Sequence, residues 1–214
     1  MTDPQHSLIA VLLDRSGSME SIKSDTEGGF NAFIAEQRKE PMDIRVTLAQ
    51  FDTDYEVVYA NRPVHDVPPL ELQPRGMTAL YDALGKLITD VGAELAATPE
   101  QQRPARVTVV VLTDGHENSS QEWTHDAVSA AIRRQEHDYS WDFVFLGANM
   151  DAVATGERLG FAPEKSMTYA ADGDGVGTAW AATTSYVARR NAAPVGAAVA
   201  GFSDEERAAA QGNR

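Results

Sequence analysis

The amino-terminal part of the chain reads Leu8-Ile9-Ala10-Val11-Leu12-Leu13-Asp14-Arg15-Ser16-Gly17-Ser18. The apolar run at residues 8–13 is typical of a strand that is buried on both faces in a parallel sheet. The run ends in a carboxylate, and two hydroxyls follow on alternate residues. Oxygen ligands of this kind suit Mg²⁺ or Mn²⁺ far better than zinc or copper. Asp14, Ser16 and Ser18 are therefore candidate ligands of a hard cation, although Asp14 could instead cap a helix that begins after it.

Apolar patterns along the rest of the chain predict strands that alternate with helices. Strands are expected at residues 44–51, 55–59, 106–114, 141–147 and 166–169. Helices are expected after Ser18, Thr78 and Thr124, at about residues 151–159 and around residues 176–187. The turn at residues 52–54 is short enough to require an antiparallel pair. The strand at 55–59 alternates polar residues and is followed by a proline-rich loop, so we expect it at the edge of the sheet. Gly28-Gly29 lies inside the first helix at a cost of about 1 kcal/mol per glycine, and we expect close packing against the sheet to compensate.

These patterns predict an α/β fold with a doubly wound, mostly parallel six-stranded sheet. The expected strand order is 3-2-1-4-5-6, with one antiparallel edge strand and helices on both faces. Ligands bind such sheets at the carboxyl ends of the strands, where the strand order reverses. Asp14 and Asp114 each end a strand, and the expected order makes those two strands neighbours. Two carboxylates should thus lie side by side at the edge where ligands bind.

The length of 214 residues suits one domain with a sizeable core. We expect that domain at residues 7–170, because the alternation of strands and helices gives way after Ala171 to the turn Asp172-Gly173-Asp174-Gly175. Residues 171–214 are interpreted as a C-terminal helical extension, with a flexible linker rich in alanine, glycine and proline at residues 192–201. Ser203 and Glu206 have the spacing of a capping box, which predicts a short final helix.

Charge and composition exclude several classes of partner. The chain has a formal net charge of −14 and no cysteine. Nucleic acids and anionic membranes bind through clustered lysine and arginine, so neither is an expected partner. The lack of cysteine excludes disulfides and thiolate metal sites. The apolar run at residues 8–13 is too short for a signal peptide or a membrane span, and a cytoplasmic location is therefore expected.

Three elements of the sequence, taken together and in this order, resemble the metal-ion-dependent adhesion site of the von Willebrand factor type A (VWA) domain. They are Asp14-x-Ser16-x-Ser18 after the apolar strand, Thr78 in a glycine-containing loop that opens a long helix, and Thr113-Asp114-Gly115 at the end of a later strand. The resemblance runs from about residue 7 to about residue 170. It implies that Ser16 and Ser18 bind Mg²⁺ through their hydroxyls and that Thr78 joins directly in the ligand-competent state. Asp14 and Asp114 would hold the metal directly or through water.

Two of these elements have simpler interpretations when each is taken alone. Asp114-Gly115 could form only a turn, and Thr78 could only cap its helix.

The resemblance also implies a function. Mg²⁺ prefers six oxygens at about 2.0–2.1 Å and gives up water reluctantly. Three neutral hydroxyls and two carboxylates, partly water-bridged, leave such an ion under-neutralised and with an open position, which favours an Asp or Glu carboxylate from a protein partner. The expected function is a metal-dependent protein-binding module that is not an enzyme. The single-domain layout is similar to stand-alone bacterial VWA proteins, including those associated with tellurium resistance.

The surroundings of the site are predicted from residues next to the three elements. Asp52 ends a strand at the same edge and is expected to support the metal ligands, unless it is only a turn residue. Arg75 and Met77 flank Gly76 where the family's loop is often smaller, so we expect a rim of different shape. His116 and Glu117 follow Gly115, and these two residues could line the rim, act as acid and base, or belong to a solvated loop.

The sequence lacks the common catalytic motifs. It contains no Gly-x-Ser-x-Gly elbow, no Gly-x-Gly-x-x-Gly after the first strand and no Walker loop. A Mg²⁺-dependent phosphoryl hydrolase that acts on a small substrate is the alternative function, because carboxylates at strand ends and a metal can carry out that chemistry. The hydroxyls at positions where such enzymes usually have a second carboxylate count against this alternative, as does the lack of an obvious general base.

Overall fold

The apolar run at residues 8–13 lies in β1 (Asp3–Asp14), near the middle of a six-stranded sheet. The computed structural model describes residues 2–212. The other strands are β2 (Asp43–Phe51), β3 (Tyr55–Pro63), β4 (Pro104–Thr113), β5 (Asp142–Ala148) and β6 (Ser166–Tyr169). Their order is β3-β2-β1-β4-β5-β6, and β3 alone pairs in an antiparallel manner. The predicted fold class and strand order are therefore confirmed.

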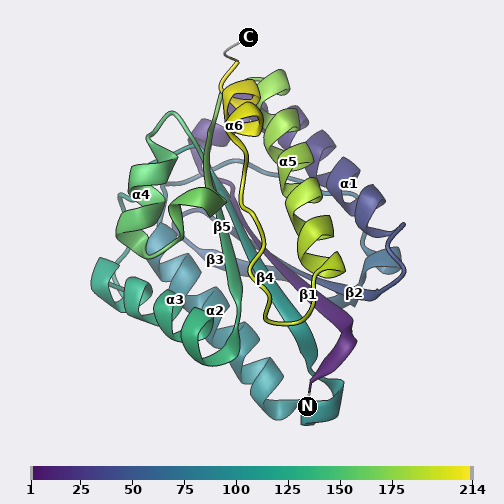
Figure 1. Ribbon diagram of the computed structural model, residues 1–214. Coiled ribbons are helices and arrows are strands. Elements are labelled where there is room, and N and C mark those ends of the chain that lie inside the picture. Colours follow the sequence, from purple (N-terminus) through teal and green to yellow (C-terminus); the bar gives the residue numbers. More distant parts are fainter. Residues whose placement is uncertain (1, 213–214) are drawn as a thin grey trace.

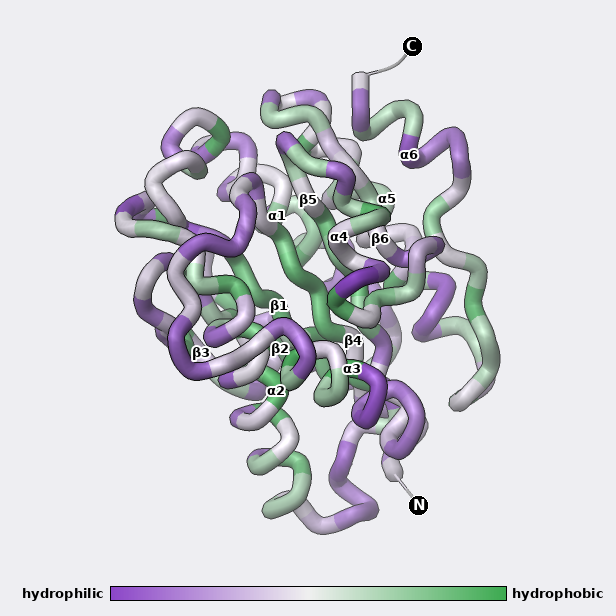
Figure 2. Tube along the Cα trace, turned by 90° about the vertical axis from the view of Figure 1, so that its left-hand side faces the viewer, coloured by the Kyte–Doolittle hydropathy of each residue, from purple (hydrophilic) through white to green (hydrophobic). Residues whose placement is uncertain are grey.

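The helices form a layer on each face of the sheet (Figure 1). They are α1 (Lys23–Gln37), which follows a 3₁₀ helix at Gly17–Ile22, α2 (Leu80–Ala97), α3 (His125–Tyr139), α4 (Ala152–Leu159), α5 (Gly173–Ala192) and α6 (Asp204–Ala210). Side chains of α1, α5 and α6 share one buried apolar cluster with the sheet. Side chains of α2, α3 and α4 share the cluster on the opposite face. In Figure 2 the central strands are mostly hydrophobic and lie between paler and more polar segments.

Two strands are longer than the sequence indicated. β1 starts at Asp3, because its polar first residues pair with β4 across a register shift between Asp3 and Ser7. β3 continues to Pro63 and contains two register shifts against β2, and Asn61 within it has a positive φ of 49°. Polar and bulged segments lack the apolar periodicity on which strand prediction depends.

The glycine pair in α1 packs differently from the sequence-based expectation. A Cβ at Gly29 would lie 2.3 Å from Cδ1 of Trp180, which belongs to α5, so this glycine allows close contact between two helices rather than contact with the sheet. A Cβ at Gly28 would meet nothing within 4 Å. Trp180 also packs against Phe30 and Phe33 of α1.

The C-terminal part of the described chain lies against the sheet and its helices. Asp172 caps α5 by accepting a hydrogen bond from the Gly175 amide. From the end of α5 the chain runs back along the sheet to α6 (Figure 1). Ser203 and Glu206 form the predicted capping box. The predicted division of the chain after residue 170 stays a prediction. Within residues 2–212 no helix is long and apolar enough to cross a membrane.

Candidate metal centre

Three loops meet at the carboxyl ends of β1 and β4. Asp14 ends β1 beside Phe51 of β2, and Asp114 follows the last residue of β4. The Ser18 hydroxyl donates a hydrogen bond of 2.6 Å to Oδ1 of Asp114. The hydroxyl oxygens of Ser16 and Ser18 lie 3.1 Å apart. The first and third predicted elements are therefore in direct contact.

Asp14 forms the floor of this cluster and is fully buried. Its Oδ1 accepts a hydrogen bond of 2.6 Å from the Ser16 amide, and its Oδ2 accepts one of 2.5 Å from the Thr113 hydroxyl. Burial raises the pKa of the Asp14 carboxyl to about 6, although the hydrogen bonds from Thr113 and Ser16 act in the opposite direction. Burial also raises the pKa of Asp114, against the effect of its hydrogen bond from Ser18. The charged forms of both carboxylates are thus short of solvation, which a cation would supply.

The second element reaches the same place through Thr78, which is buried just before α2. A Cβ added to Gly115 would lie 3.0 Å from the Thr78 hydroxyl oxygen and 3.8 Å from that of Ser18. Gly115 therefore leaves the Thr78 hydroxyl free to lie beside the loop that carries Asp114. The structure brings together all five residues that the sequence nominated as metal ligands, namely Asp14, Ser16, Ser18, Thr78 and Asp114. Their role as ligands stays a prediction.

The donor set fits a hard divalent cation. All its atoms are carboxylate or hydroxyl oxygens, which Mg²⁺ and Mn²⁺ prefer, and the Ser18 hydroxyl oxygen lies within 3.1 Å of both the Ser16 hydroxyl and the Asp114 carboxylate. Within residues 2–212, no group of three or more His, Asp or Glu side chains is arranged to hold a metal ion. Metal binding at this edge would therefore depend on the hydroxyls as well as on the two carboxylates.

Asp52 lies at the predicted edge and binds two arginines. Its Oδ2 accepts hydrogen bonds of 2.9 Å from Nε of Arg15 and from Nε of Arg75, and its Oδ1 accepts one of 2.7 Å from the Asp54 amide. Burial acts to raise the pKa of Asp52, but the Asp54 amide and the two guanidinium groups outweigh it and lower the pKa. Arg15 also pairs with Glu56 at 2.6 Å. Asp52 thus joins the loop after β1 to the loop before α2.

Gly76 and Met77 lie in the loop just before Thr78, which is the predicted rim of the site. Gly76 has a φ of +68°, and its carbonyl accepts a hydrogen bond of 3.3 Å from the Gly17 amide. The Met77 amide donates to the Thr53 hydroxyl at 3.1 Å, whereas the Met77 side chain is 51% exposed. The main chain of this rim is therefore tethered, and an apolar side chain projects into solvent.

His116 and Glu117 have different environments although they are neighbours. His116 is exposed. Oε1 of Glu117 accepts hydrogen bonds from the amides of Ser119 and Ser120, and Oε2 accepts from the Tyr81 amide and the Ser120 hydroxyl. Both carboxylate oxygens of Glu117 are occupied, so this residue holds its own loop against the start of α2.

Two residues that contact the cluster were given no role from the sequence, although Thr113 belongs to the third motif. Thr113 binds the Asp14 carboxylate, and Asn118 binds the main chain of Thr78. Thr113 had a visible signal, because it is a hydroxyl residue at the end of an apolar strand and directly precedes Asp114. Asn118 had none, since its partner lies 40 residues away in the sequence.

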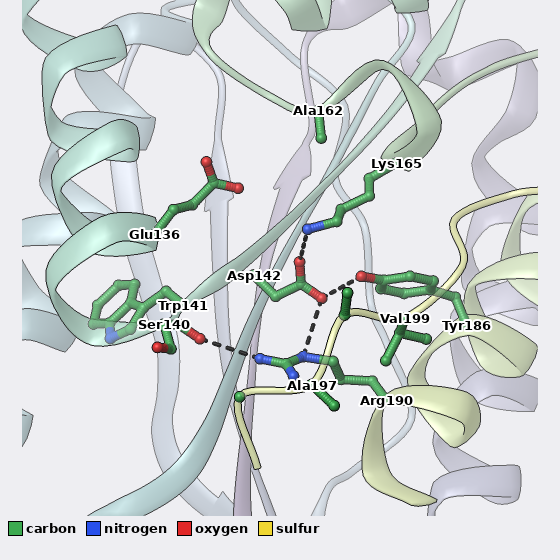
Figure 3. A pocket seen from close by; sticks show the side chains of 12 residues that line it. Glu136, Ser140, Trp141, Asp142, Ala162, Lys165, Tyr186, Arg190, Ala197 and Val199 are labelled. Atoms are coloured by element: carbon green, nitrogen blue, oxygen red, sulfur yellow. Dashed lines mark hydrogen bonds and ion pairs between the residues drawn. The ribbon is translucent and has the colours of Figure 1, made fainter. Parts of the chain in front are cut away.

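A separate pocket of about 410 Å³ lies at the amino end of β5, away from this edge (Figure 3). Asp142 is buried there between Lys165, the Tyr186 hydroxyl and Arg190, whose Nε is 3.3 Å from Oδ2 of Asp142. Arg190 also donates to the Ser140 carbonyl at 3.1 Å. These interactions tie α5 and the turn before β6 to the sheet, so we interpret the cluster as structural.

Solved structures share this fold, although comparisons of the sequence find no relative. No protein-family model matches the chain, and no curated protein matches it in sequence. A von Willebrand factor type A structure from Catenulispora acidiphila superimposes with a TM-score of 0.57 at 14% identity, over 85% of this chain and 42% of that one. The fold of this chain is therefore that of a VWA domain.

Proximal thread matrix protein 1 from the mussel byssus has the same arrangement, with a TM-score of 0.60 at 14% identity over 86% of this chain and 47% of that one. Another structure of that protein has a zinc-occupied MIDAS motif, which is the metal-ion-dependent adhesion site. It matches with a TM-score of 0.57 at 15% identity over 84% of this chain and 45% of that one. The chain thus spans less than half the length of the solved proteins named here.

Proposed function

We propose that this domain is a metal-dependent protein-binding module. Asp14, Ser16, Ser18, Thr78 and Asp114 would hold Mg²⁺ or Mn²⁺, and the ion would take an Asp or Glu carboxylate from a protein partner. The observation that carries the proposal is the hydrogen-bonded cluster that Ser18 forms with Ser16 and Asp114 above the buried Asp14 carboxylate. The zinc-occupied motif of a protein with the same fold supports a divalent metal at this kind of site.

Some residues of the site orient the buried carboxylate, and others are exposed where a partner would bind. Thr113 and the Ser16 amide fix both oxygens of Asp14, so this carboxylate is oriented before any ligand arrives. Ser18 is exposed, and a partner would therefore approach from the side of the serine loop. A bound divalent cation would supply the attraction for an anionic oxygen that the acidic protein otherwise lacks.

Of the two residues that could act as acid or base, Glu117 is unavailable, and this counts against phosphoryl hydrolysis. A hydrolase needs a general base that can reach a water or a substrate hydroxyl. Both oxygens of Glu117, the carboxylate closest to Asp114 along the chain, are taken by hydrogen bonds to its own loop and to α2.

The proposal is tested by Mn²⁺ titration followed by electron paramagnetic resonance of the free ion. Wild type should bind one Mn²⁺ in competition with Mg²⁺, and Thr78→Ala should bind it more weakly. Thr183→Ala is the matched control, because Thr183 is also buried but donates its hydroxyl hydrogen bond within α5. The same variants are then used to recover partners from cell extract in Mg²⁺ or EDTA. A partner that is retained equally by wild type and Thr78→Ala in both conditions would rule out the metal bridge.

A further inference from the structure

Asn118 forms hydrogen bonds with the main chain of Thr78 in both directions. The Thr78 amide donates to Oδ1 of Asn118 at 2.9 Å, and the Asn118 amide donates to the Thr78 carbonyl at 3.0 Å. Thr78 lies two residues before the first residue of α2. Thr78 precedes the N-cap residue Ala79, so its amide lies outside the helix, and the Asn118 side chain supplies the acceptor for it at a buried residue.

The contact with Asn118 joins the second loop of the site to the third. The amides of Met77 and Ala79 are held by Thr53 and by the Asp52 carbonyl, and both of these belong to the turn after β2. Asn118 instead belongs to the loop that follows β4 and carries Asp114. The main chain at Thr78 is therefore tied to the loop that carries Asp114 through both the side chain and the main-chain amide of Asn118.

Glu117 strengthens this connection from the neighbouring position. Its Oε2 accepts a hydrogen bond of 2.9 Å from the Tyr81 amide in the first turn of α2. The loop after β4 is thus fastened to the start of α2 at two successive residues. A rigid connection of this kind holds the main chain of Thr78, and with it the Thr78 hydroxyl, without touching the ion.

We propose that Asn118 is a positioning residue for the metal centre, which sets the Thr78 hydroxyl at the correct distance from Asp114. The proposal rests on the proposed function, since it assumes that the five oxygens bind a metal. Removal of groups that orient metal ligands typically weakens metal affinity by about 10–100-fold. Asn118→Ala should therefore bind Mn²⁺ about tenfold more weakly than wild type.

The experiment compares four proteins, which are wild type, Asn118→Ala, Asn118→Ser and Asn31→Ala. Serine keeps a neutral, though shorter, acceptor and should restore part of the affinity. Asn31 is the matched control, because its Oδ1 accepts a hydrogen bond of 2.9 Å from the Leu70 amide, on the side of the molecule formed by α1. Each protein is measured for its Mn²⁺ dissociation constant, for hydrogen exchange of the Thr78 amide without metal, and for its melting temperature in EDTA.

We expect faster exchange at Thr78 and weaker Mn²⁺ binding in Asn118→Ala, intermediate values in Asn118→Ser, and unchanged Mn²⁺ binding in Asn31→Ala. Faster exchange with unchanged Mn²⁺ affinity in both Asn118 variants would overturn the positioning role and leave the proposed function intact. Equal weakening in Asn31→Ala would also overturn it, because loss of stability would then explain the effect. A wild-type protein that binds no Mn²⁺ would refute the proposed function itself.

Discussion

The hydroxyl of Thr113 donates a hydrogen bond of 2.5 Å to Oδ2 of Asp14 and so joins the ends of the two central strands. β1 and β4 are parallel neighbours, and their register pairs Leu13 with Leu112. The bond therefore fixes the buried carboxylate from the strand that leads to Asp114. The orientation of the first candidate ligand depends on the strand that supplies the last one.

Replacement of Thr113 by valine should destabilise the protein by about 1–3 kcal/mol at neutral pH, because a buried carboxylate loses a charge-assisted hydrogen bond. The pKa of Asp14 should rise further, since the Thr113 hydroxyl acts to lower it. Urea unfolding in EDTA measures the change. Thr108→Val is the control, because Thr108 is buried in the same strand but lies far from its carboxyl end. An equal loss of stability in the two variants would contradict this prediction.

The raised pKa of Asp14 predicts how pH affects the protein in EDTA. The pKa of about 6 in the folded state exceeds the ordinary value of 3.8, so the folded state holds this proton more tightly. Protonated Asp14 therefore adds about 3 kcal/mol to the free energy of unfolding below about pH 4, and this contribution is lost as the pH rises through 6. Asp14→Asn should remove this dependence. Unfolding free energies measured from pH 4 to pH 8 test it, and identical slopes in the two proteins would exclude Asp14 as the source.

The same proton should compete with the metal. A ligand carboxylate must be deprotonated to bind a cation, so Mn²⁺ affinity of the wild type should fall as the pH decreases below about 6. Isothermal titration calorimetry in buffers of different ionisation enthalpy would report the proton released on binding. A constant affinity between pH 5 and pH 7.5 would contradict this expectation.

Asp52→Asn should cost about 3 kcal/mol, because it leaves the buried Arg15 guanidinium without one of its two carboxylates. Arg75→Gln should have a much smaller effect, since the Arg75 side chain is 58% exposed and water replaces the lost interaction. The lowered pKa of Asp52 means that its contribution is present above about pH 4 and is lost at lower pH. Chemical denaturation of the two variants at pH 7 provides the comparison. Equal losses of unfolding free energy in the two variants would show that the buried ion pair of Arg15 with Asp52 contributes no more than the exposed pair of Arg75 with Asp52.

The two glycines of α1 should respond to alanine in opposite ways. Gly29→Ala should destabilise by about 1–3 kcal/mol, because the new methyl group would overlap the Trp180 ring. Gly28→Ala meets open space and should stabilise by about 0.5–1 kcal/mol through the better helix propensity of alanine. Urea midpoints of the two variants give the sign directly. A stabilised Gly29→Ala protein would mean that the contact between α1 and α5 can relax at little cost.

The sequence predicted those parts of the structure that depend on periodicity and on the ends of strands. The apolar runs of β1 and β4 are continuous, so their burial, their neighbouring positions and the placement of Asp14 and Asp114 at the same edge of the sheet followed from the order of elements. The VWA resemblance added Thr78, and the structure places its hydroxyl beside Gly115.

Features that depend on contacts distant in the sequence were not predictable. The proposed role of Asn118 rests on two hydrogen bonds with a residue 40 positions earlier, and a polar loop gives no indication of which asparagine makes such bonds. The expectation for Gly29 was wrong for the same reason, because its partner Trp180 lies in a helix about 150 residues away. The function of Glu117 was left open until its four hydrogen bonds were known.

The packing of Trp180 against Phe30 and Phe33 has a consequence for how the chain can be divided. α5 reaches from Asp172, just beyond the carboxyl end of β6, to Arg190, beside Asp142 at the amino end of β5. It therefore covers the sheet along the whole length of the strands, from their carboxyl ends to their amino ends. A chain shortened after residue 170 would leave the aromatic side of α1 open to water, and such a protein should aggregate rather than bind metal.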